Sequence, residues 1–178
     1  MTKTVLGIFS NRDEANDAVE ALRKADYKPA DISIVMKEGE EKEEVVESTG
    51  EHVVKGATSG AVTGGVIGGI AGLLIGIGAI AIPGVGALLI GGPLATALGL
   101  TGAAATTVSG AVTGVLAGGL VGALVGLGVP EEQAKVYEER IREGGILLAV
   151  SAKDGKEDEV LKMMEEHGAT EARVISLK

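Results

Sequence analysis

The sequence contains no cysteine and no tryptophan, and only three of its 178 residues are aromatic. Without cysteine the chain cannot form disulfides, thiolate-ligated zinc sites or iron–sulfur clusters, and it cannot use thiol catalysis. The two histidines, His52 and His167, stand far apart and predict no metal site. Ser59, Ser109 and the threonines near them have no histidine or acid close by that could activate a nucleophile, so we expect them to be small packing residues. We therefore expect no catalytic residues, no metal and no cofactor, and a protein that is not an enzyme.

Positive charge is also scarce, because the net charge is −9 and no lysine or arginine lies between Lys55 and Lys135. Such an acidic chain is not expected to bind nucleic acid. No charged residue of either sign occurs between Lys55 and Glu131, and this stretch contains 22 of the 29 glycines. The composition therefore divides the chain into residues 1–51, a region at 52–129, and residues 130–178. We call 52–129 the uncharged region, because it carries no charge after Lys55.

Both charged ends have the pattern of a strand, a helix and a second strand. At the N-terminal end, short apolar runs at 4–9 and 32–36 flank a segment at 11–25 with helical spacing of its apolar residues. Residues 37–51 are acidic and predict a solvated loop or a short helix. At the C-terminal end, the predicted order is a helix at 130–143, a strand at 146–151, a helix at 157–167 and a strand at 172–177.

This βαβ…βαβ pattern predicts an α+β fold in which two halves, residues 1–51 and 130–178, form a split ferredoxin-like domain. A long glycine-zipper α-helical hairpin is then inserted between the halves. Because strands from both halves pair in one sheet, residues 37 and 145 are expected on the same side of any membrane.

Glycine recurs at every fourth position in two runs of the uncharged region. The first run is Gly56, Gly60, Gly64, Gly68, Gly72 and Gly76, and the second is Gly110, Gly114, Gly118, Gly122 and Gly126. On a helix this spacing keeps successive glycines on one face, where another helix backbone can approach closely. The hexapeptide SGAVTG occurs at 59–64 and again at 109–114, which indicates an internal duplication. We expect these eleven glycines to be the packing and assembly residues.

The two runs predict helices at about 56–82 and 108–128, each roughly 28–33 Å long and thus close to the thickness of the bilayer hydrocarbon. The residues between them, 83–107, are also uncharged and predict a bent or re-entrant connector with a short helix near 94–105. Four residues are expected to make its turns: Pro83, Gly84, Gly86 and Pro93.

Several phrases resemble those of the general stress protein 17M-like family, a group of bacterial glycine-zipper stress proteins. They are VLGIF at 5–9, DISIV at 31–35, IGAIAIPGVG at 77–86, GPLA at 92–95, GALVGLGVPEE at 122–132 and GILLAV at 145–150. A tyrosine like Tyr137 lies in the helix between the last two. The resemblance covers nearly the whole chain. It implies a stress-associated protein, often membrane-associated, with no family catalytic residues to carry over.

The function expected from these features is a non-enzymatic stress protein that forms homo-oligomers through its zipper helices. The first form of this hypothesis embeds the helices in the lipid bilayer as a structural or permeability element, with both charged ends in the cytoplasm. The alternative is a water-soluble cytoplasmic shell, ring or filament with an apolar layer of zippers. A second alternative is a regulatory ferredoxin-like domain that binds a small effector, although the fold alone does not establish such a role.

Overall fold

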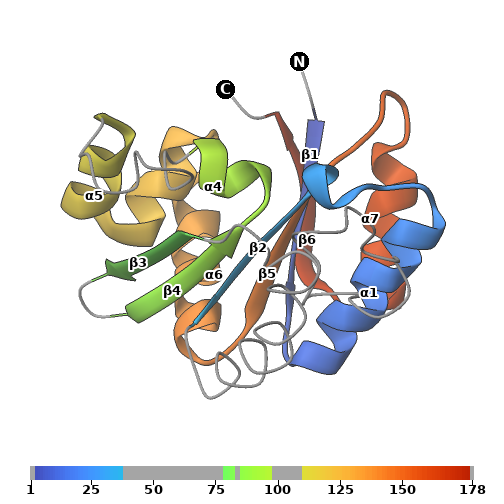
Figure 1. The fold of residues 1–178 in the computed structure, drawn as a ribbon, viewed down its shortest axis with the longest axis horizontal. Helices are drawn as coiled ribbons and strands as arrows, with labels where there is room; N and C mark the ends of the chain where they lie inside the picture. Colours follow the sequence, from blue (N-terminus) through green and yellow to red (C-terminus); the bar gives the residue numbers. More distant parts are fainter. Residues whose placement is uncertain (1–2, 38–77, 83–84, 98–109, 177–178) are drawn as a thin grey trace, which may run out of the picture.

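The computed structural model describes residues 3–37, 78–82, 85–97 and 110–176. Within these residues the chain forms one sheet, and helices cover both of its faces (Figure 1). The acidic segment at 38–51 and the first glycine run at 56–76 lie outside the described residues.

The first strand–helix–strand unit comprises β1 (Lys3–Phe9), α1 (Arg12–Lys24) and β2 (Ile32–Lys37), with a short 3-10 turn at Pro29–Asp31. Helix α1 starts where the side chain of Asn11 accepts a hydrogen bond from the Glu14 N–H at 2.9 Å. Its apolar face, spaced as in an amphipathic helix, is buried: Ala15, Ala18, Val19 and Leu22.

The second unit comprises β5 (Ile146–Ser151), α7 (Glu157–Glu166) and β6 (Thr170–Ser176), and α6 (Glu131–Arg142) precedes it. Each of these elements begins and ends within about two residues of the predicted one, as do β1, α1 and β2. Helix α6 ends before Gly144, whose φ of +100° is a conformation that glycine adopts without strain. The local patterns at both ends of the chain therefore identify the elements correctly.

In the sheet, strands of the first strand–helix–strand unit alternate with strands of the second. Its strand order is β3-β4-β2-β5-β1-β6, so β5 of the second unit lies between β1 and β2 of the first. Every pairing is antiparallel. Strand β1 pairs with β5 from Thr4 opposite Ser151 to Phe9 opposite Ile146, and it also pairs with β6 on its other side. The two ends of the chain therefore fold as one sheet, although the uncharged region separates them in sequence.

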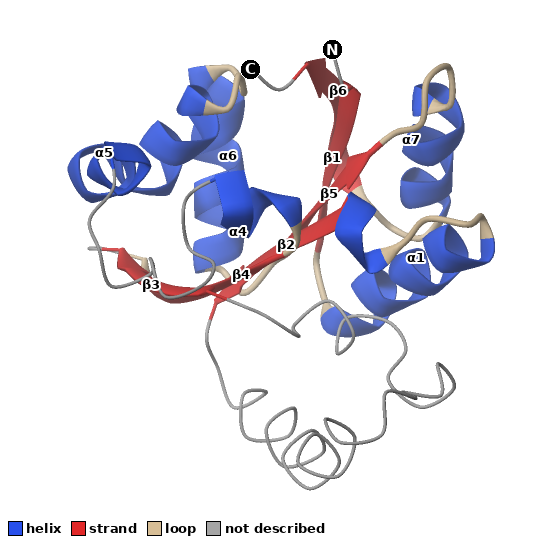
Figure 2. Ribbon diagram, turned by 45° about the horizontal axis from the view of Figure 1, so that its top comes forward, coloured by secondary structure: helices blue, strands red, loops and turns tan. Residues whose placement is uncertain are grey.

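The two faces of the sheet carry different helices (Figures 1 and 2). Helices α1 and α7 cover one face, where alternate strand residues such as Val5, Phe9 and Leu148 are buried with them. Helices from the middle of the chain and α6 cover the other face, over Leu6, Ile8 and Leu147. Because neighbouring residues of a strand point to opposite faces, these strands are apolar without interruption. The result has three layers, with the sheet in the centre.

The described part of the uncharged region extends this sheet. It forms β3 (Gly78–Ile82), β4 (Gly86–Gly91) and the short helix α4 (Pro93–Ala97), and β4 pairs with β2 from Ile34 opposite Gly91 to Lys37 opposite Leu88. The predicted helix at about 56–82 is therefore wrong for its last five residues, which form a strand. The predicted connector at 83–107 likewise contains a strand. Its predicted helix near 94–105 corresponds in part to α4 at Pro93–Ala97, and residues 98–105 lie outside the described residues.

The strand β4 was not predicted from the sequence for a physical reason. Leu88 and Ile90 are buried on one face of the sheet and Leu89 on the other. A strand buried on both faces has no alternation of apolar and polar residues, and a short apolar run of this kind cannot be distinguished from a buried helix by its periodicity. Two of the predicted turn residues, Pro83 and Gly84, lie outside the described residues. Gly86, with a φ of +104°, begins β4 after the β3–β4 turn, and Pro93 begins α4.

Helix α4 is fixed to the sheet by the residues around the phrase GPLA. The hydroxyl of the buried Ser33 in β2 accepts a hydrogen bond from the Leu94 N–H at 3.0 Å. Gly92 has a φ of +79° and lies against β2 so closely that a Cβ atom there would be 2.1 Å from the Ile32 carbonyl oxygen. Only glycine therefore fits where the chain turns from β4 into α4.

Candidate self-association surface

Helix α5 (Gly110–Gly126) contains the whole second glycine run and no charged residue. Each glycine costs a helix about 1 kcal/mol relative to alanine, so α5 depends on packing against its neighbours. Its C-terminal half supplies that packing, because Leu120, Ala123 and Leu124 are buried in the same cluster as Tyr137 and Ile141 of α6. The second predicted zipper helix therefore packs against the sheet domain of its own chain.

The helix is broken at Gly119, which has a φ of +64° and a ψ of −157°. This backbone conformation is essentially restricted to glycine. Gly110, Gly114 and Gly118 precede the break, whereas Gly122 and Gly126 follow it. The prediction of one continuous helix with five glycines on a single face is therefore wrong for this structure, because Gly119 interrupts the four-residue register.

At the break, a carboxylate from α6 accepts a hydrogen bond from the α5 backbone. The Val121 N–H, close to the start of the second half of α5, donates to Glu138 Oε2 at 3.2 Å. In an unbroken helix this N–H would donate to the carbonyl of Ala117, four residues earlier. Arg142, one turn further along α6, donates from Nη2 to Glu138 Oε1 at 3.0 Å and holds the carboxylate in place. A negative charge at the start of a helix segment also interacts favourably with its dipole.

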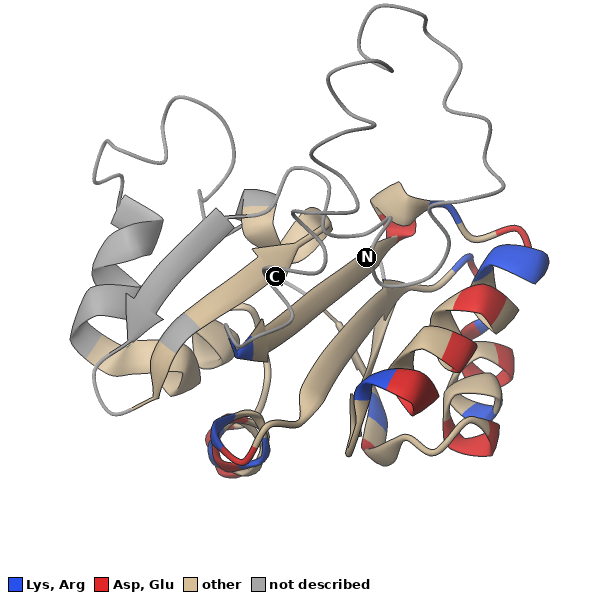
Figure 3. Cartoon of the chain, turned by 60° about the horizontal axis from the view of Figure 1, so that its bottom comes forward, with Lys and Arg blue, Asp and Glu red and all other residues tan. Residues whose placement is uncertain are grey.

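The outer side of α5 is exposed and uncharged. Gly118 and Gly126 are exposed, and a Cβ atom built on either would have no neighbour within 4 Å. Val125 is 41% exposed, more than any other large apolar residue among those whose side chains the structure describes. Charged residues gather instead on α1, α6 and α7 (Figure 3). We call these three exposed positions the outer face of α5, although Gly118 precedes the break at Gly119 and Val125 and Gly126 follow it.

The other predicted assembly residues divide into two groups. Gly56, Gly60, Gly64, Gly68, Gly72 and Gly76 lie outside the described residues. Gly110 and Gly114 lie in the first half of α5, and Gly122 is half-buried in its second half. The structure thus brings part of the second run to the molecular surface, on a helix whose opposite side is in the core.

A buried tyrosine connects α6 to the last strand and was not singled out by the sequence patterns as a structural residue. The Tyr137 hydroxyl donates to the carbonyl oxygen of Glu171 at 2.7 Å, and Gln133 Nε2 donates to the carboxylate of the same residue at 3.3 Å. Burial raises the pKa of Tyr137 to about 12, and the nearby Glu171 charge acts in the same direction. Glu171 has a φ of +51°, at a point where the β1–β6 register shifts. No sequence motif indicates such a long-range contact.

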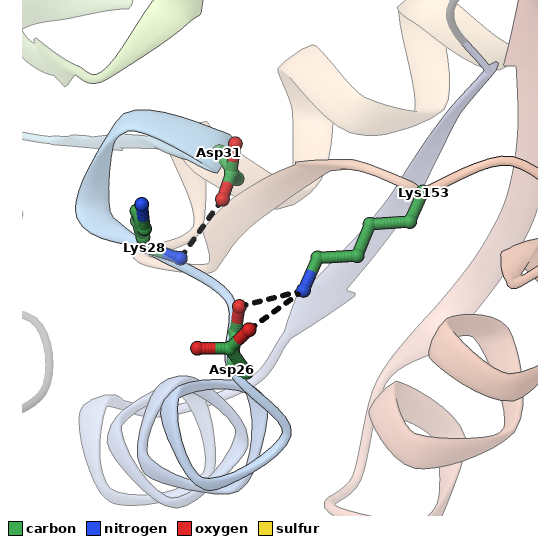
Figure 4. A network of polar contacts seen from close by, with 4 residues as sticks. All are labelled: Asp26, Lys28, Asp31 and Lys153. Atoms are coloured by element: carbon green, nitrogen blue, oxygen red, sulfur yellow. Dashed lines mark hydrogen bonds and ion pairs between the residues drawn. The ribbon is translucent and has the colours of Figure 1, made fainter.

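A second polar network joins the two strand–helix–strand units at the surface. Lys153 Nζ, after β5, donates to both the carbonyl and the carboxylate of Asp26, after α1, at 2.9 and 3.2 Å (Figure 4). Close by, the Lys28 N–H donates to Asp31 Oδ2 at 2.9 Å. These side chains are exposed, and exposed ion pairs contribute little to stability. We interpret the network as a surface connection between loops.

A small hollow lies between the end of β1 and α6, lined by residues that include Phe9, Arg140 and Glu143. Its volume of about 140 Å³ is below the range of roughly 300–1,000 Å³ typical of ligand pockets. Arg140 Nη1 also lies 3.8 Å from a Glu143 carboxylate oxygen, so its charge is partly compensated. The hollow therefore gives the effector-binding alternative little support.

Two kinds of feature are absent from the described ranges. No group of three or more histidine, cysteine, aspartate or glutamate side chains there is arranged to hold a metal ion. Among the helices in those ranges, none combines the length and the apolar character needed to cross a membrane.

Comparison with known proteins gives a match to a family model over part of the chain. Residues 4–80 match the family model described as the heat induced stress protein YflT domain. The match starts in β1, includes α1 and β2, and ends within β3. No curated protein and no solved structure matches the chain. This match confirms the expected stress-protein character. The finer resemblance to the 17M-like glycine-zipper family stays a prediction. The comparison therefore supports a stress-associated protein, and it does so through residues 4–80.

Proposed function

We propose that this protein is a non-catalytic, stress-associated assembly protein. A split ferredoxin-like domain would present its uncharged, glycine-rich insertion to further copies of the same chain. The observation that carries the proposal is the outer face of α5, where Gly118, Val125 and Gly126 are exposed on an uncharged helix. In the same part of the helix Leu120, Ala123 and Leu124 are buried. A helix that is apolar all round is normally covered on every side.

The strand order supports the ferredoxin-like description. Without β3 and β4, the order is β2-β5-β1-β6, and one helix follows the first strand of each unit. This is the arrangement of a βαββαβ domain in which the connection from β2 to β5 carries the insertion. In a two-layer domain of that kind one face of the sheet is open; here α4, α5 and α6 cover it.

Self-association is favoured by the chemistry of the outer face. Exposed glycines let a second helix backbone approach closely, which gains dispersion contacts and weak Cα–H···O bonds. No charge has to be desolvated when two such surfaces meet, because residues 78–97 and 110–126 contain none. Charged residues on α1, α6 and α7 would remain in water and keep the assembly soluble (Figure 3).

The test compares two substitutions at one position. Gly118→Leu places a large side chain where the structure has open space, so the fold of the chain is preserved while close approach of a second helix is blocked. Gly118→Ala is the matched control, because it raises helix propensity in the same way but leaves the face small. We expect light scattering after gel filtration to give an oligomer for wild type and Gly118→Ala, and a monomer of 17.8 kDa for Gly118→Leu. Equal masses for both variants would refute the role of this face.

Insertion into a membrane is the second candidate function. It is favoured by the complete absence of charge between Lys55 and Glu131, a region that includes the first glycine run. Fractionation of expressing cells without detergent separates the two candidates. Recovery in membranes, with release by detergent alone, would support the bilayer candidate, and recovery as regular particles in the soluble fraction would support the water-soluble assembly.

A further inference from the structure

We draw no further inference here: the strongest candidate, the outer edge of β3 (Gly78–Ile82), an uncharged strand that among the described residues pairs with β4 alone, carries nothing, because nothing in the structure shows what covers it.

Discussion

At the residue scale, glycines with similar backbone angles have different roles. Gly92 has both a positive φ and no room for a side chain, because the β2 backbone lies against it. Gly155, in the loop before α7, has a φ of +77°, and a Cβ atom there would have no neighbour within 4 Å. Comparison of the two positions separates the cost of backbone strain from the cost of a steric clash.

We therefore predict that Gly92→Ala destabilises the protein more than Gly155→Ala. Both variants suffer the strain of a positive φ, about 1–2 kcal/mol, and only Gly92→Ala also forces β2 and α4 apart. The excess should be at least about 1–3 kcal/mol in the free energy of unfolding, measured with urea. Equal losses would show that α4 does not depend on this contact.

Tyr137 allows a prediction about pH. Its pKa is raised to about 12 in the folded chain, against about 10 in an unfolded one. The unfolded state thus loses its proton first as the pH rises, and this group's contribution to stability is complete below pH 10 and is lost between about pH 10 and 12. A shift of this size corresponds to about 2–3 kcal/mol.

The measurement compares wild type with Tyr137→Phe. The variant loses the 2.7 Å hydrogen bond to the Glu171 carbonyl and should be less stable by about 1–2 kcal/mol at neutral pH. It should also lack the Tyr137 part of the alkaline destabilisation. If both proteins lose stability in parallel from pH 10 to 12, the hydroxyl is not protected by burial as described.

At the element scale, the short helix α4 depends on β2 for its first turn. Ser33→Ala removes the hydroxyl that accepts from the Leu94 N–H and leaves that buried donor without its partner. We expect a loss of about 1–2 kcal/mol in the free energy of unfolding. Thr170→Ala is a suitable comparison, because its hydroxyl donates to the Ile8 carbonyl over a longer distance of 3.3 Å in a half-buried position, and its loss should cost less.

The elements also show which parts of the fold the sequence could predict. Amphipathic spacing located α1 and α7, and short apolar runs located β1, β2 and β5, because their lengths and capping residues are local signals. Strands β3 and β4 were missed because their apolar runs have no polar alternation and because β2, the second partner of β4, lies far earlier in the chain. The glycine spacing predicted a helix at about 108–128, where the structure has α5 at Gly110–Gly126, but it did not predict the break at Gly119 or the hydrogen bond from the Val121 N–H to Glu138 beside it.

At the scale of the whole molecule, charge and apolar surface are separated. Helices α1, α6 and α7 carry charged residues (Figure 3), whereas the sequences of β3, β4, α4 and α5 contain none. Part of the uncharged region completes the core of the domain, and the outer face of α5 is left exposed. The same segment can therefore stabilise one chain and offer a surface to the next. We expect assembly to resist salt, because no ion pair crosses such an interface.

The most direct test of self-association is the mass of the wild-type protein in detergent-free buffer, measured by light scattering over a hundredfold range of concentration. Our account predicts a mass that is a multiple of 17.8 kDa and that rises with concentration or stays at a closed oligomer. A constant mass of 17.8 kDa over the whole range would contradict it, and the outer face of α5 would then need another explanation.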